Sequence, residues 1–137
     1  MPYEDEEPPF WEADAELNAL SGAVIGAAIE VHRRTGPGLD EGWYREALCV
    51  EFRLRGIAFA KEVIIEVEYK GEIIGTKRLD FLVGGRLVVE LKAVEELSKL
   101  HKAQVLTYLR ITGHKLGLLI NFNTIMLKDG IKRVICP

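Results

Sequence analysis

Residues 86–94 read Arg-Leu-Val-Val-Glu-Leu-Lys-Ala-Val, an apolar run with the composition of a buried β-strand that carries two charges, Glu90 and Lys92. Side chains two residues apart project from the same face of a strand, so Glu90 and Lys92 share a face with Val88. Burying a charge is costly unless the charge is paired or bound to a metal, so this pair suggests a site at the edge of a core. A solvent-facing ion pair is the alternative for an isolated Glu-x-Lys, and the rest of the chain has to decide between them.

Hydrophobic periodicity divides the chain into helices and strands in a definite order. Apolar residues recur at helical spacing in three segments, whereas alternating or continuously apolar patterns mark the strands. Asp40 and Ser98 are good N-caps, and Gly36, Gly56 and Gly113 can end the three helices. We expect helices over residues 17–35, 40–56 and 98–113, strands over 63–69, 72–83, 86–93 and 116–122, and a final hairpin in which 125–127 and 131–135 flank Lys128-Asp129-Gly130.

The order of these elements predicts the fold class. A strand, helix, strand crossover near the end implies one parallel pair within a mixed sheet. We therefore expect an α/β fold of three layers, with a mixed central sheet flanked by helices. With 137 residues, the chain is long enough for one domain with a substantial core.

Charge is distributed unevenly along the chain. Residues 1–16 hold seven of the 21 acidic side chains and none of the 18 Lys and Arg residues, so the remainder carries 14 acidic and 18 basic side chains, a net charge of +4. We expect residues 1–16 to be an acidic, disordered leader and 17–137 to be the single domain. A sharper alternative is that the leader competes with nucleic acid for the basic face of the domain.

No apolar stretch approaches the ~20 residues of a membrane span, and the acidic start is unlike a secretory signal. We therefore expect a cytoplasmic protein with no membrane partner.

Further candidate site residues accompany the Glu-x-Lys pair, on the second β-strand and on two helices. Asp80 interrupts a second apolar strand, and two acids on adjacent core strands are harder to explain as surface residues than one. Glu41 and Tyr44 lie three residues apart at the start of the second helix, and Gln104 and Tyr108 lie four apart on the third, so each pair shares a helix face. Taken singly, a Glu in a first helical turn complements the helix dipole, and a Tyr at core spacing packs.

Taken in order, an acid on a helix, an Asp on a strand, Glu-x-Lys on the next strand and Gln-x-x-x-Tyr on a helix resemble the PD-(D/E)xK nuclease superfamily. More narrowly, Gly38-Leu-Asp-Glu-Gly-Trp-Tyr44 resembles the signature of the GxxExxY proteins, and residues 28–32, 89–94 and 117–122 are similar to that family's other blocks. The resemblance covers residues 17–135. It implies the restriction-endonuclease-like fold and a metal-dependent nuclease that hydrolyses phosphodiester bonds in DNA.

The resemblance also implies a catalytic and metal-binding set. Glu41, Asp80, Glu90 and Lys92 would be the catalytic residues. Mg²⁺, or Mn²⁺ in its place, would be held by Glu41, Asp80, Glu90 and the main-chain carbonyl of Leu91, because hard cations prefer oxygen ligands. Lys92 would position or deprotonate the attacking water and stabilise the transition state.

Substrate contacts follow from the same resemblance. Tyr44, Gln104 and Tyr108 would bind the substrate, with Gln104 and Tyr108 near its phosphate. Basic side chains around the site could follow a nucleic-acid backbone, namely Arg78, Lys99, His101, Lys102 and Arg110. DNA is the expected partner and RNA an alternative. The oligomeric state is left open, with a homodimer among the options.

Two other functions remain open from the sequence. One is a non-catalytic nucleic-acid-binding or protein-interaction module that retains the nuclease fold, since function depends on the site and not on the fold. The other is a small scaffold or regulatory subunit whose acidic leader docks a partner.

A shared metal requires Asp80 and Glu90 to lie on one face of the sheet. Directly opposed residues of an antiparallel pair share a face, so a two-residue Gly84-Gly85 loop would turn Asp80 away from Glu90. We expect a three-residue loop over 83–85 with Gly85 in the left-handed region. That loop pairs Asp80 with Val88 and makes Glu90 its diagonal neighbour.

Overall fold

The computed structural model describes residues 11–137 as three helices, five strands and one short 3-10 helix. In chain order the elements are α1 (Ala15–Thr35), α2 (Glu41–Leu54), β1 (Phe59–Tyr69), β2 (Glu72–Val83), β3 (Leu87–Lys92), α3 (Lys99–Thr112), β4 (Leu116–Asn121), η1 (Leu127–Gly130) and β5 (Ile131–Ile135). None of the helices in this part of the chain is long and apolar enough to cross a membrane.

The five strands form one mixed sheet in the order β1, β2, β3, β4, β5. Neighbouring strands are antiparallel except β3 and β4, which are parallel and are joined by α3. The predicted α/β class with a single parallel pair is therefore confirmed. The crossover also explains why β3 and β4 are so apolar, because a parallel pair at the centre of a sheet is covered on both faces.

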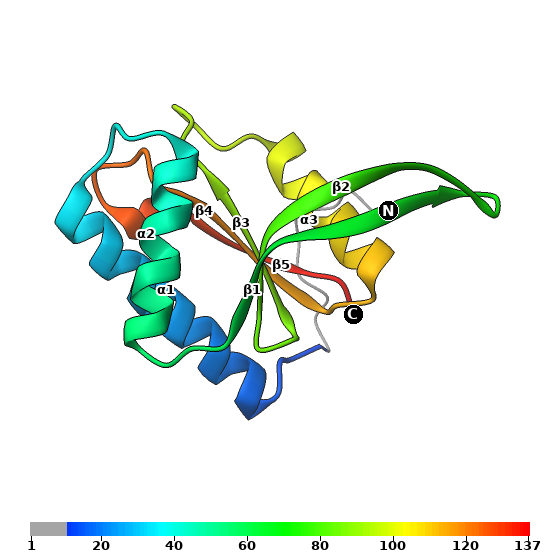
Figure 1. Cartoon of the computed structure of the whole chain (residues 1–137), viewed down its shortest axis with the longest axis horizontal. Coiled ribbons are helices and arrows are strands. Elements are labelled where there is room, and N and C mark those ends of the chain that lie inside the picture. The colour runs from blue at the N-terminus through cyan, green and yellow to red at the C-terminus, as the bar shows by residue number, and fades with distance from the viewer. Residues whose placement is uncertain (1–10) are drawn as a thin grey trace.

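Helices cover both faces of the sheet and give the molecule three layers. Helices α1 and α2 lie on one face and α3 lies on the other (Figure 1). Phe81, Leu91 and Ile120 belong to the core under α1 and α2, whereas Val88 and Leu119 belong to the core under α3. Successive residues of β3 thus point to opposite faces, so Glu90 shares the α3 face with Val88.

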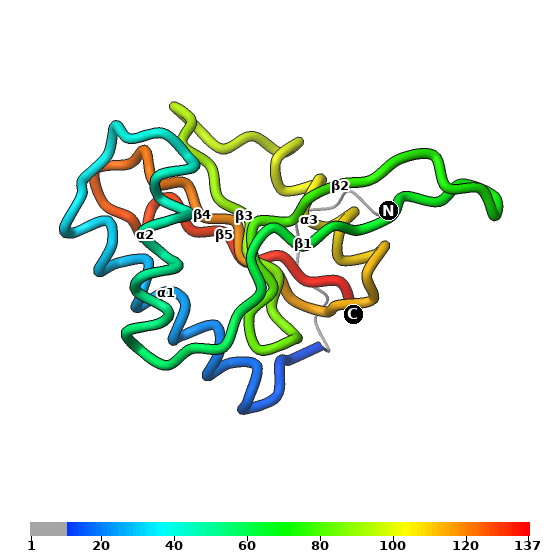
Figure 2. The backbone as a smooth tube through the Cα atoms, viewed as in Figure 1, coloured from blue at the N-terminus to red at the C-terminus, as the bar shows by residue number. Residues whose placement is uncertain are grey.

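One end of the sheet extends well beyond the other strands. β2 pairs with β3 only over residues 81–83, while β1 and β2 continue as a two-stranded arm past the body of the molecule (Figure 2). Every side chain from 72 to 78 is exposed. The sheet therefore forks at the position where β2 leaves β3.

The predicted final hairpin is wrong. Residues 125–127 form no strand, because the chain turns through η1 and β5 pairs antiparallel with β4 instead. Ile125 is 86% exposed, whereas Leu127 is buried. Gly130 passes so close to the carbonyl oxygen of Asn121 that an added Cβ would lie 2.2 Å from it, which holds the turn against the end of β4.

The folded part of the chain begins earlier than the predicted boundary between residues 16 and 17. Helix α1 starts at Ala15, Asp14 caps it by accepting from the Leu17 amide, and Ala13 is buried in the core. The carboxylate of Asp14 also binds Arg86. Residues 11–16 of the predicted acidic leader are thus part of the fold, and residues 1–10 lie outside the described part of the chain.

Candidate active site

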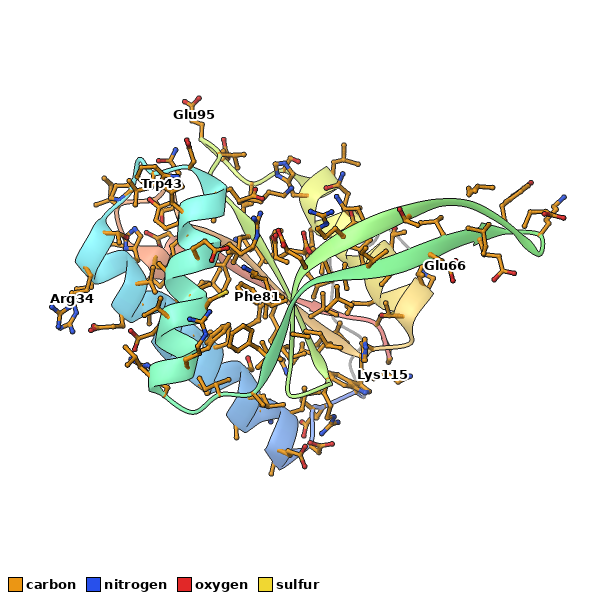
Figure 3. All side chains as sticks on the ribbon, in the orientation of Figure 1. Arg34, Trp43, Glu66, Phe81, Glu95 and Lys115 are labelled. Atoms are coloured by element: carbon orange, nitrogen blue, oxygen red, sulfur yellow. The ribbon has the colours of Figure 1, made fainter. Side chains whose placement is uncertain are left out.

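Asp80 and Glu90 face each other at the fork of the sheet. The antiparallel pairing of β2 and β3 ends at Phe81 and Val89, and Asp80 and Glu90 are the next residues beyond this last pair. Their carboxylates lie close together, because each accepts a hydrogen bond from the backbone of the other strand. Phe81, labelled in Figure 3, is fully buried and packs edge-on against Phe52 of α2, which fixes the strand just beyond Asp80.

The loop that sets this register differs by one residue from the prediction. It spans Gly84-Gly85-Arg86 and not residues 83–85, and both glycines have positive φ, 58° and 69°. The expected left-handed Gly85 and the odd loop length are confirmed. The predicted pairing of Asp80 with Val88 is wrong, because the loop lies one residue further along the chain and Val88 pairs with Leu82 instead.

Each of the two carboxylates binds the backbone of the opposite strand. The Asp80 amide donates to Glu90 Oε1 at 2.9 Å, and the Leu91 amide donates to Asp80 Oδ2 at 2.8 Å. Asp80 is 7% exposed and Glu90 is 6% exposed. The side chains thus replace strand-to-strand hydrogen bonds where β2 and β3 separate, which holds both carboxylates in fixed positions.

Arg45 of α2, which the sequence reasoning did not identify, is also part of the site. Its Nε donates to Asp80 Oδ1 at 2.9 Å, and its terminal nitrogens lie 3.5 Å from Glu41 Oε2 and 3.6 Å from Glu62 Oε1. Burial works against the charge of this guanidinium, yet the hydrogen bond with Asp80 and the carboxylates of Glu41 and Glu62 raise the pKa of Arg45. One cation therefore connects three acids.

Glu62 is a second residue that sequence reasoning missed. It has a φ of 53°, unusual for a residue other than glycine, and it lies between Lys61 and Val63, which pair with Phe81 and Leu79. The register therefore places Glu62 across from Asp80 on β1. This local irregularity brings a further carboxylate toward the guanidinium of Arg45.

The acids of the site are not fully neutralised. Burial, and then the charge of Asp80, raise the pKa of Glu90 to about 7. The pKa of Glu41 is also raised, first by burial and then by Asp80, although Lys92 and Arg45 partly oppose this shift. A carboxylate held next to other carboxylates in a low dielectric keeps its proton unless a cation arrives.

Lys92 ends β3 on the same face as Glu90 and is partly buried. Its ammonium makes no ion pair with any described residue within 4.0 Å, yet its charge lowers the pKa of both Glu41 and Glu90. Its main-chain carbonyl accepts from the Phe122 amide at 2.9 Å, which fixes the end of the strand. The ammonium is therefore close to the acids and available for a further partner.

The structure does not support a substrate-binding role for Tyr44. The residue is fully buried, and its ring stacks on Phe122 with 4.5 Å between centroids. Its hydroxyl donates to the Gly36 carbonyl at 2.6 Å and accepts from the Leu39 amide at 3.1 Å. Tyr44 thus fixes the loop that leads into Glu41, and the prediction that it contacts substrate is wrong because the side chain cannot reach solvent.

Gln104 and Tyr108, the two residues predicted on α3, differ in exposure. Gln104 is exposed and Tyr108 is partly buried against the core under α3. Lys77 of β2 places its ammonium 5.6 Å from the centre of the Tyr108 ring, a cation–π contact across the gap between the arm and α3. Lys77 also lowers the pKa of Glu90, so it is a basic residue of the site that the sequence reasoning overlooked.

The basic residues predicted to follow a nucleic-acid backbone fall into different settings. Arg78 is exposed on the arm, and its Nη1 lies 3.8 Å from Glu62 Oε1. His101 caps α3, because its Nδ1 accepts from the Ser98 amide, and its role is therefore structural. Lys99 is exposed at the start of α3, and Arg110 is exposed near its end.

The donor set fits a hard divalent cation only in part. Within residues 11–137, no group of three or more Asp, Glu, His and Cys side chains is placed to hold a metal ion. Asp80 and Glu90 are adjacent, whereas Glu41 is connected to Asp80 through Arg45. Carboxylate oxygens are the ligands that Mg²⁺ and Mn²⁺ prefer, so Asp80 and Glu90 have suitable donor atoms. Glu41 is separated from them by the guanidinium of Arg45.

Comparison with known families gives the chain its class. It matches the model of the PD-(D/E)XK nuclease superfamily over residues 18–134. Because the match covers most of the 137 residues, the chain belongs to this superfamily, and its mixed sheet between helices is the restriction-endonuclease-like fold. Members of the superfamily are typically nucleases, which indicates an enzyme that acts on nucleic acid. No curated protein matches the chain.

Proposed function

We propose that the protein is a metal-dependent nuclease that hydrolyses phosphodiester bonds in DNA at the fork between β2 and β3. The observation that carries the proposal is the pair of buried, opposed carboxylates, Asp80 and Glu90, with Lys92 two residues further along β3. An acid pair that is only partly neutralised is costly to bury, so it is expected where a cation binds. Within the superfamily, we also propose membership of the GxxExxY proteins.

The proposed metal ligands are Asp80, Glu90, the carbonyl of Leu91 and Glu41. A Mg²⁺ or Mn²⁺ ion held there would supply Lewis acidity and neutralise charge on a phosphate. The backbone hydrogen bonds of Asp80 and Glu90 fix their carboxylates before the cation arrives, which limits the cost of reorganisation. Glu41, at the first position of α2, is half-buried and lies 3.5 Å from Arg45 Nη2, so it would have to leave this guanidinium to join them.

The basic and polar residues beside the acids are proposed to orient the substrate. The Lys92 ammonium would hydrogen-bond to the attacking water and to a phosphate oxygen, because no ion pair within the described chain engages it. Lys77, Gln104 and Tyr108 would hold the phosphate backbone between the arm and α3. DNA is the proposed substrate, and RNA is the alternative that the assay below compares.

A cleavage assay tests this function. Single- and double-stranded DNA and RNA would be incubated with the protein and Mg²⁺ or Mn²⁺, beside the nearly isosteric Asp80→Asn variant. We expect wild type to cleave DNA only when metal is present and Asp80→Asn to be inactive. Equal cleavage by both proteins would place the activity elsewhere. Metal binding without cleavage of any substrate would favour the non-catalytic nucleic-acid-binding module instead.

A further inference from the structure

Arg45 fills the space between the proposed metal ligands with a cation that belongs to the chain. Each of its three guanidinium nitrogens lies near a different acid: Nε near Asp80, Nη1 near Glu62 and Nη2 near Glu41. The side chain is only 19% exposed, so solvent screens these contacts weakly. A planar guanidinium suits this role, because its donors diverge in a fixed fork and can bind several carboxylates at once.

The contacts of Asp80 show why this arrangement conflicts with a bound metal. Its Oδ2 accepts from the Leu91 amide and its Oδ1 accepts from Arg45, so both oxygens are engaged. A divalent ion on either oxygen would lie within a few ångströms of the guanidinium. At that separation two cations repel strongly in a partly buried site. The guanidinium also separates Asp80 from Glu41, which would have to approach each other to share an ion.

We propose that Arg45 is the resident cation of the metal-free site, and that a divalent metal must displace its guanidinium from Asp80 before it can bind. The inference rests on the proposed metal site at Asp80 and Glu90. Once displaced, Arg45 keeps a partner in Glu62 on β1, on the far side of the fork from Glu90. Arg45 is thus a positioning residue that sets the affinity of the site for metal.

Competition of this kind has a definite thermodynamic signature. When a side chain of the protein occupies a binding site, part of the ligand's binding free energy is used to displace that side chain. The apparent affinity for the ligand is reduced accordingly. Removal of the guanidinium should therefore strengthen metal binding, even though it also removes favourable contacts from the metal-free protein. Arg45→Met keeps the length and apolar stem of the side chain while removing the charge.

Calorimetric titration of Mn²⁺ into the full chain tests the inference. We expect Arg45→Met to bind Mn²⁺ roughly tenfold more tightly than wild type, within the usual range of coupling between two sites. Arg45→Lys keeps one positive charge but loses the divergent donors of the guanidinium. Its affinity for Mn²⁺ should therefore lie between those of wild type and Arg45→Met. The matched control is Arg55→Met, which removes an exposed arginine at the C-cap of α2 that pairs with Glu51. Its Mn²⁺ affinity should equal that of wild type.

The outcomes separate this inference from the proposed function. Unchanged or weaker Mn²⁺ binding by Arg45→Met, with wild type still binding, would overturn the displacement of Arg45 and leave the metal site standing. Absence of binding by every variant would remove the metal site and the inference with it. If Arg45→Met does not fold, Arg45→Lys decides the matter, because a Lys variant with wild-type or weaker affinity would also overturn the inference.

Discussion

Two groups of acids and arginines in this molecule have opposite charge balances. On the surface of α1, the exposed cluster consists of Arg33 and Arg34, which are well exposed, and Glu30, whose side chain is 20% exposed, so one acid has two bases. At the fork, the site cluster consists of four acids, Glu41, Glu62, Asp80 and Glu90, around the guanidinium of Arg45, and Arg78 lies 3.8 Å from Glu62 at its edge. Figure 3 shows Arg34 at the outer edge of the molecule, well away from the fork.

The carboxyl groups of the two clusters respond in opposite directions. The hydrogen bond and charge of Arg33 lower the pKa of Glu30, so this acid is ionised and satisfied. Burial and the neighbouring Asp80 raise the pKa of Glu90 to about 7. The difference teaches that arginines compensate the carboxylate of the exposed cluster, whereas the cations near the site cluster do not fully compensate Glu41 and Glu90. A site whose carboxylates are not fully compensated is suited to a divalent ion or to a basic group brought by a partner.

The largest expected effect is on catalysis. Lys92→Ala should lower the rate of metal-dependent DNA cleavage by at least about 100-fold, because it removes the cation proposed to act on water and phosphate. Arg34→Ala, in the exposed cluster, should leave the rate at the wild-type value. Initial rates at saturating metal would measure both. Similar rates for Lys92→Ala and wild type would contradict the catalytic role proposed for Lys92.

The next effect is on stability and its pH dependence. The pKa of Glu90 is raised from 4.5 to about 7 in the folded protein. The folded protein therefore binds this proton more tightly than the unfolded chain does. This group therefore lowers the stability of the metal-free protein progressively as the pH rises from about 4.5 to 7, by up to about 3 kcal/mol at higher pH. Glu90→Gln, which cannot ionise, should be more stable than wild type at about pH 8 by a similar amount.

Urea unfolding of wild type and Glu90→Gln across this pH range measures the difference. The two stabilities should converge at about pH 4, where the wild-type carboxyl is protonated in both states. If Glu90→Gln were less stable than wild type at every pH, neighbouring groups would already stabilise the ionised Glu90 carboxylate in the folded protein, contrary to this prediction.

A smaller effect distinguishes the core from the site. Tyr44→Phe removes a buried hydroxyl that binds the Gly36 carbonyl and the Leu39 amide, so it should cost about 1–3 kcal/mol of stability. The affinity for DNA and the cleavage rate of the folded protein should be unchanged, because the hydroxyl faces away from solvent. A loss of DNA affinity without a loss of stability would restore the substrate-binding role predicted from the sequence.

The smallest effect is expected in the exposed cluster. Glu30→Gln should lower stability less than any of the other variants, because helix-surface pairs at i and i+3 or i+4 contribute little and are screened by salt. Thermal unfolding at low and high salt would check this. A cost comparable to that of breaking a buried pair would contradict the view that the ion pairs of the exposed cluster are weak.

Sequence reasoning identified the strand residues of the site because their anomaly is local. Asp80 and Glu90 each place a charge in an apolar strand, and two-residue periodicity together with the Gly84-Gly85 loop is enough to argue that they share a face. The loop position was wrong by one residue, because Val83 continues the strand while Arg86 completes the loop. A shift of one in the loop changes which residues pair directly.

Residues that depend on tertiary placement were harder to predict. Arg45 lies four residues after Glu41 on the same helix face, so its presence beside the site could have been inferred from spacing. Glu62 could not, since its place across from Asp80 depends on the register of the arm and on a positive φ. Tyr44 shares a helix with Glu41, yet helix spacing alone does not say which face enters the core.

The same limit explains the error at the end of the chain. Lys128-Asp129-Gly130 has the composition of a hairpin turn, but β5 finds its partner in β4 and the turn residues form η1. Turn composition predicts a change of direction and not which strand is paired afterwards.

Proton release on metal binding is the measurement that tests the metal site most directly. Mn²⁺ would be titrated calorimetrically into wild type in buffers of different ionisation enthalpy, at about pH 6 and at about pH 8.5. A carboxyl group must lose its proton to ligate a metal. Because the pKa of Glu90 is about 7, Mn²⁺ binding at about pH 6 should release close to one proton from Glu90. Binding at about pH 8.5 should release almost none. Binding that releases no proton at the lower pH, or no binding at either pH, would contradict a metal site at Asp80 and Glu90.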